Sequence, residues 1–108
     1  LRLGDFEPAL TRLKEAADLG PKRSDISISL AATLIRLGRA DEAIAALSDI
    51  DSVSPENRHI AYYNRALAYW ALEDTEAAYR DFYTSAALKP GFAPAEDALG
   101  QFQVASVE

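Results

Sequence analysis

The feature that most constrains the fold of this chain is an internal repeat with a period of 34 or 35 residues. Pro55 follows Pro21 by 34 residues, and Pro90 follows Pro55 by 35. Three further series keep the same two spacings: Ala9, Ala43, Ala78; Leu3, Leu37, Leu72; and Leu13, Leu47, Phe82. Such a period is typical of repeat proteins, in which each unit buries its apolar face against the next unit. The register therefore holds along the whole chain, and neighbouring units are expected to cover one another.

The clearest unit is residues 59–90, which predicts two helices joined by a short corner. Apolar residues recur at helical spacing over 59–72, Glu73 and Asp74 interrupt them, and a second helical pattern over 75–88 ends at Pro90. Asp74 is a suitable N-cap for the second helix. The first helix carries two neighbouring apolar stripes: Tyr62, Ala66, Tyr69 and Ile60, Tyr63, Leu67, Trp70. One helical hairpin cannot bury both stripes, so a neighbouring unit or a ligand is expected to cover part of them.

The segments AYYNRALAYWALED, EAAYRDF and ALKP resemble the tetratricopeptide repeat family, and the resemblance extends over essentially the whole chain. It implies a helix-turn-helix unit in which small residues, here Ala66 and Ala78, let the two helices cross closely. The chain departs from the pattern at Glu73, which stands where Gly38 stands one repeat earlier.

The predicted fold class is all-α, a right-handed superhelical solenoid of about six helices that forms a single domain over 1–108. We expect residues 1–23 to be the end of a truncated first repeat, 24–58 a second repeat, 59–92 a third repeat and 93–108 a terminal capping helix. The expected helices cover 6–18, 24–37, 40–51, 59–72 with a possible start at 55, 75–88 and 94–105. Because the sequence opens within a repeat and lacks an initiating methionine, we expect it to be a piece of a longer chain.

The last helix is expected to be a solubilising cap because Glu96 and Gln103 occupy the places of the aromatic Tyr62 and Tyr69. The alternative is a degenerate repeat that continues into a longer protein.

The composition argues against a catalytic or metal-binding role for this chain. There is no cysteine and a single histidine, His59, so a zinc site would need carboxylates alone. His59 is expected at a solvated surface. The formal net charge of −6, with scattered basic residues, argues against a nucleic-acid partner. No run is long and apolar enough to span a bilayer, and neither a catalytic residue nor a cofactor is predicted.

The resemblance implies a concave surface lined by the first helices of successive repeats. It places these residues in a partner-binding groove: Ile28, Ala32, Ile35, Arg36, Ile60, Tyr63, Asn64, Leu67, Trp70 and Gln101. Asn64 matches an asparagine that in many family members hydrogen-bonds the backbone of a bound extended peptide. Trp70 is expected to be a binding residue, and the alternative is that it packs between neighbouring repeats.

The predicted function is a protein-interaction module that binds an apolar or aromatic peptide or helix of a partner protein. The alternative is a structural spacer or self-association segment of a larger protein. The truncated N-terminal edge would leave part of an apolar stripe uncovered, so it is also a candidate surface for homo-oligomer formation. That stripe consists of Phe6, Leu10, Leu13 and Ala17.

Overall fold

The computed structural model describes residues 24–107, which form helices joined by short turns. Five of the elements are α-helices: α2 (Ser24–Arg36), α3 (Ala40–Ala46), α4 (Arg58–Ala71), α5 (Thr75–Leu88) and α6 (Ala93–Val107). Two short 3₁₀ helices, η1 (Ile50–Ser52) and η2 (Pro55–Asn57), connect α3 to α4. Within residues 24–107 there is no strand, which confirms the all-α prediction. The helix expected over 6–18 lies outside the described residues.

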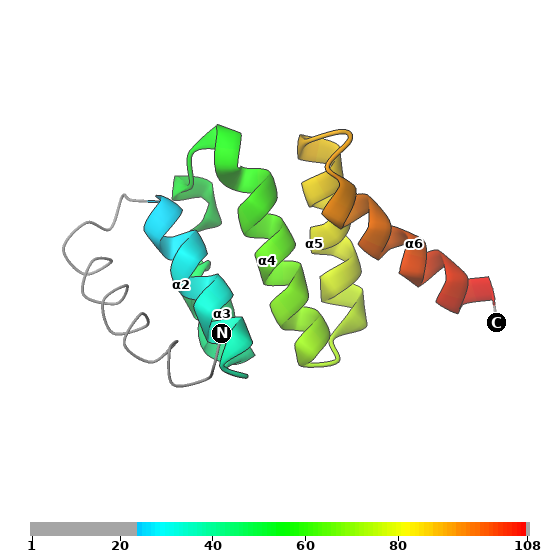
Figure 1. Cartoon of the computed structure of the whole chain (residues 1–108), viewed down its shortest axis with the longest axis horizontal. Helices are drawn as coiled ribbons and strands as arrows, with labels where there is room; N and C mark the ends of the chain where they lie inside the picture. The colour runs from blue at the N-terminus through cyan, green and yellow to red at the C-terminus, as the bar shows by residue number, and fades with distance from the viewer. Residues whose placement is uncertain (1–23, 108) are drawn as a thin grey trace.

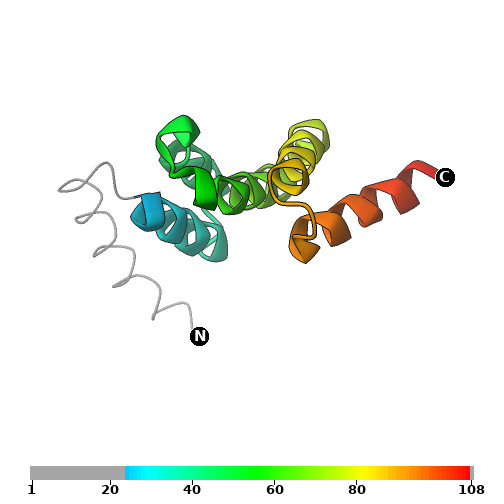
Figure 2. The ribbon, with the colours of Figure 1, turned by 90° about the horizontal axis from the view of Figure 1, so that it is seen from above.

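The helices form consecutive hairpins that pack side by side (Figure 1). α2 packs on α3 and α4 on α5, while α3 contacts α4 and α5 contacts α6 across the unit boundaries. Seen from above, α2, α4 and α6 lie along one side of the molecule and α3 and α5 along the other, with α4 set back between α2 and α6 (Figure 2). We call the first of these sides the α2–α4–α6 face.

The core is continuous across the unit boundaries because α4 contributes to two apolar clusters. One cluster joins α2, α3 and η1 to Ala61 and Ala68 of α4, and the other joins α4 and α5 to Ala98 of α6. The aligned small residues are fully enclosed, since Ala66 and Ala78 both have an exposed fraction of 0%. Enclosure of an alanine requires close approach of the facing helices, as expected for the crossing of α4 and α5.

The two hairpin corners share a left-handed backbone residue at the same repeat position. Gly38 has φ +75° and Glu73 has φ +62°. Asp74 follows Glu73 and caps α5, because its side chain accepts a hydrogen bond from the backbone N–H of Ala77 at 3.3 Å. The predicted N-cap is therefore confirmed.

The second helix of the 24–58 unit ends earlier than predicted. We expected a helix over 40–51, whereas α3 ends at Ala46 and η1 follows from Ile50. Residues 48–52, SDIDS, are weak helix formers, whereas the corresponding end of α5 contains Ala86, Ala87 and Leu88.

Candidate functional site

The residues assigned from the sequence to a partner-binding groove belong to helices α2, α4 and α6. On α2, Ile28, Ala32 and Ile35 are partly buried and Arg36 is exposed; on α4, Ile60, Tyr63, Leu67 and Trp70 are partly buried and Asn64 is buried; on α6, Gln101 is exposed. The structure places α2 directly beside α4. It connects α4 to α6 through the rings of Trp70 and Phe102, whose centroids are 4.8 Å apart, and α4 to the turn before α6 through those of Tyr63 and Phe92, 5.6 Å apart.

Asn64 is the most enclosed polar side chain in this set. Its exposed fraction is 9%, and its amide makes no hydrogen bond to another residue within 24–107. Among the described residues, no fully buried side-chain nitrogen or oxygen atom lacks a hydrogen-bond partner. The Asn64 amide atoms are therefore not completely enclosed, and water can satisfy them in the free chain.

The Trp70 side chain lies between two other aromatic rings of the same chain. Its ring centroid is 5.5 Å from that of Phe82 on α5 and 4.8 Å from that of Phe102 on α6. The residue is partly buried and packs against the cluster that contains Ala66 and Ala78. This is the packing role that the sequence left open as the alternative for Trp70, and a role in partner binding remains a prediction.

An ion pair that was not predicted from the sequence lies inside the α4–α5 hairpin. The Arg65 guanidinium donates two hydrogen bonds to the Asp81 carboxylate, at 2.6 and 3.0 Å, and Asp81 is only 4% exposed. The same guanidinium lies 5.3 Å from the ring centroid of Tyr62 and 5.9 Å from that of Tyr69. The hydrogen bonding that Arg65 donates to the Asp81 carboxylate raises the pKa of Arg65. These aromatic residues therefore enclose a cation in addition to filling space near the helix crossing.

A signal for this ion pair is present in the repeat alignment. Arg65 stands 35 residues after Leu30, and Asp81 stands 35 residues after Ala46. Two apolar places on facing helices thus change together to residues of opposite charge. Such a paired change indicates contact between the two places.

His59 is buried, which corrects the expectation of a solvated surface residue. Its exposed fraction is 9%, and its ring meets that of Phe92 edge-on with centroids 4.8 Å apart. Its backbone oxygen accepts a hydrogen bond from the Ser85 hydroxyl at 2.6 Å. Burial and the nearby positive charge of Lys89 lower the pKa of His59 below its ordinary value of 6.5. The spacing of apolar residues could not reveal this because Phe92 reaches His59 from the turn between α5 and α6.

Metal and membrane sites have no candidate in the part of the chain that the structure describes. No cluster of three or more histidine, cysteine, aspartate or glutamate residues there could hold a metal ion. No helix within 24–107 has the length and apolar character needed to cross a membrane.

Stacked helical hairpins with apolar clusters shared between neighbours define a helical repeat protein. A family model described as Tetratricopeptide repeat matches residues 1–68, which is more than half of the chain, and a second model with the same description matches residues 59–92. The chain belongs to the tetratricopeptide repeat family, whose repeats generally serve as protein–protein interaction modules and are typically non-catalytic. Comparisons with curated proteins and with solved structures gave no significant match.

Proposed function

We propose that the α2–α4–α6 face is a groove that binds an apolar or aromatic peptide or helix of a partner protein. The proposed contacts are the residues assigned from the sequence: Ile28, Ala32, Ile35, Arg36, Ile60, Tyr63, Asn64, Leu67, Trp70 and Gln101. We retain the two repeats over 24–58 and 59–92, with residues 1–23 before them and a helix over 93–108 after them. The proposed role is that of a binding module without catalytic activity or a nucleic-acid ligand.

The observation that carries the proposal is the enclosed amide of Asn64. An asparagine amide has two donors and two acceptor positions, so it can bond both the N–H and the C=O of an extended backbone. Asn64 lies next to Tyr63 in sequence, and Leu67 is one turn further along α4. A polar group surrounded by partly buried apolar side chains is typical of the centre of a protein-binding surface.

The charged residues near this face favour an apolar ligand over a charged one. Arg65 is engaged with Asp81, and the Arg58 guanidinium donates to the backbone oxygens of Val53 and Asp51. Arg36 on α2 is exposed and lies at the edge of the proposed groove. A cation such as Arg36 can orient a ligand, whereas clamping a carboxylate or a phosphate backbone requires several cations.

The test selects peptides from a random library displayed on phage against the whole chain and measures their affinity by titration calorimetry. We expect the selected peptides to contain apolar or aromatic residues. Asn64→Ala should weaken binding by about 0.5–1.5 kcal/mol, the usual net value of one hydrogen bond. Leu67→Ala should weaken it by about 1 kcal/mol or more if Leu67 lies in the bound core.

The matched control is Tyr83→Ala, because Tyr83 lies on α5 and is 60% exposed. Binding should be unchanged in this variant, and thermal melting should show that every variant is folded. Peptides whose affinity responds to Tyr83→Ala but not to the two α4 variants would refute the groove.

The spacer alternative is favoured by one observation, the packing of Trp70 between Phe82 and Phe102. If the stripe on α4 serves only to join neighbouring helices, the library should return no specific peptide. The same selection therefore distinguishes the two functions.

A further inference from the structure

The outer side of α5 gathers the exposed apolar side chains of the described residues. The large apolar residues that are exposed within 24–107 are Leu72, Tyr79, Tyr83 and Leu88. Three of them belong to α5, and Leu72 lies at the corner that precedes it. Tyr79 and Tyr83 are four residues apart and therefore project from the same side of the helix.

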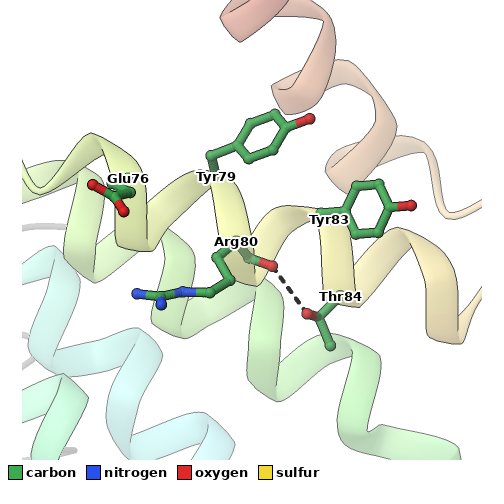
Figure 3. Close-up of a pocket in the computed structure, with 5 residues that line it drawn as sticks. All are labelled: Glu76, Tyr79, Arg80, Tyr83 and Thr84. Atoms are coloured by element: carbon green, nitrogen blue, oxygen red, sulfur yellow. Dashed lines mark hydrogen bonds between the residues drawn. The ribbon is translucent and has the colours of Figure 1, made fainter.

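These two tyrosines line a shallow hollow of about 330 Å³ together with Glu76, Arg80 and Thr84. We call this surface the outer α5 face. Figure 3 shows Tyr79 and Tyr83 projecting from successive turns of α5, with the Arg80 side chain extending back toward the turn that carries Glu76. The hollow is thus walled by aromatic rings and has an acid and a base at its edge.

The aromatic wall is anchored to the neighbouring helix. The Tyr79 ring meets that of Phe102 on α6 with centroids 5.5 Å apart, and the Tyr79 and Tyr83 rings are 6.4 Å apart. The Thr84 hydroxyl is already used, since it donates to the backbone oxygen of Arg80 at 2.9 Å. Glu76 and Arg80 are consequently the groups of the outer α5 face that remain to select a partner.

The order of these two charges makes the face complementary to itself. Glu76 and Arg80 are one helical turn apart, and within residues 24–107 neither forms an ion pair. When two copies pair with their α5 helices antiparallel about a two-fold axis, Glu76 of each copy meets Arg80 of the other. A parallel arrangement would instead bring like charges together.

We propose that a second copy of this chain docks on the outer α5 face, with the two α5 helices antiparallel, the Glu76–Arg80 pairs around the two-fold axis, and Tyr79 and Tyr83 beside them. One helix face is smaller than the roughly 800 Å² per partner of a standard interface, so the dimer is weak. None of its residues is among the contacts proposed for the α2–α4–α6 face, so the proposal does not depend on the proposed function.

The experiment is sedimentation velocity of the whole chain over a range of concentrations. The wild-type chain should shift toward a dimer as its concentration rises. Glu76→Arg and Arg80→Glu should each raise the dissociation constant by about 10-fold or more, since each places like charges opposite one another twice. An equimolar mixture of these two variants should recover dimer formation, because one copy then presents two cations and the other two anions.

Two further variants identify the surface. Tyr83→Ala should weaken the dimer, whereas Leu88→Ala should not, because Leu88 is exposed but five residues further along the helix and on a different side. Unchanged thermal melting of the charge variants should show that they are folded. A wild-type chain that stays monomeric at every concentration would overturn the proposal, and so would a dimer that is insensitive to the charge variants or a mixture that does not recover.

Discussion

At the scale of single residues, the corner positions show how one side chain changes the cost of a backbone conformation. Glu73 has φ +62°, in the left-handed region, while the aligned Gly38 has φ +75°. A Cβ in this region crowds the backbone, and glycine avoids that strain. The chain therefore uses a strained residue at one corner and an unstrained one at the other.

We predict that Glu73→Gly stabilises the protein by about 0.5–1 kcal/mol, because relief of the strain exceeds the added entropy of the unfolded chain. The matched control is Gly38→Ala, which should destabilise by about 1 kcal/mol although no atom lies within 4 Å of the new Cβ. Urea unfolding measures both. A less stable Glu73→Gly variant would show that the Glu73 side chain contributes more than its backbone costs.

Ala78 provides a second prediction at this scale. It has no exposed surface and lies in the cluster with Ala66 and Phe82. Ala78→Leu should destabilise the protein by about 1–3 kcal/mol through overpacking, and Ala87→Leu, at an exposed place on the same helix, should change stability by less than about 0.5 kcal/mol. Equal melting temperatures for the two variants would mean that α4 and α5 can separate without loss.

At the scale of the helical hairpin, the α4–α5 hairpin contains an ion pair where the α2–α3 hairpin has leucine and alanine. Breaking a buried pair leaves an unpaired charge, so Asp81→Ala alone should cost about 3–5 kcal/mol and Arg65→Leu alone a similar amount. The double variant Arg65→Leu/Asp81→Ala restores the residue types of Leu30 and Ala46. It should recover most of the loss.

Urea denaturation of the two single variants and the double variant gives the coupling energy directly. If the losses of the single variants simply add in the double variant, the two side chains are not energetically coupled despite their 2.6 Å contact.

The junction of α4 with the α5–α6 corner predicts a dependence of stability on pH. Because the folded state lowers the pKa of His59 below 6.5, the unfolded state binds more protons as the pH falls through that value. The free energy of unfolding should therefore decrease from about pH 6.5 downward until the folded-state pKa is reached. Denaturation between about pH 7 and pH 5.5 tests this. A His59→Gln variant should lack the slope, and an equal slope in that variant would assign the effect to other groups.

The hairpins and their enclosed alanines could be predicted from the sequence because the same pattern of apolar and small residues recurs at spacings of 34 and 35 residues. The contacts at the α5–α6 boundary were harder to predict. The contacts of Phe92 with His59 and of Phe102 with Trp70 depend on how the α5–α6 turn and α6 pack against α4, which the periodicity within a hairpin does not determine. The end of α3 was missed for a local reason, since the low helix propensity of residues 48–52 outweighed the alignment.

At the scale of the whole molecule, the stack presents two different surfaces. The α2–α4–α6 face is partly apolar around the enclosed amide of Asn64, and the outer α5 face carries exposed tyrosines between opposite charges. In a repeat array each unit contacts only its neighbours, so the outward sides of the helices remain available as binding surfaces. We expect the first surface to bind a partner and the second to bind a copy of the same chain.

The central claim is that the α2–α4–α6 face binds a peptide, and amide chemical-shift mapping tests it most directly. The whole chain, labelled with ¹⁵N, is titrated with a peptide selected from the random library, at concentrations where the free chain is monomeric. We predict that the largest shifts fall on α2, α4 and α6, centred on Asn64 with its side-chain amide included. Shifts confined to α3 and the outer α5 face would contradict the account.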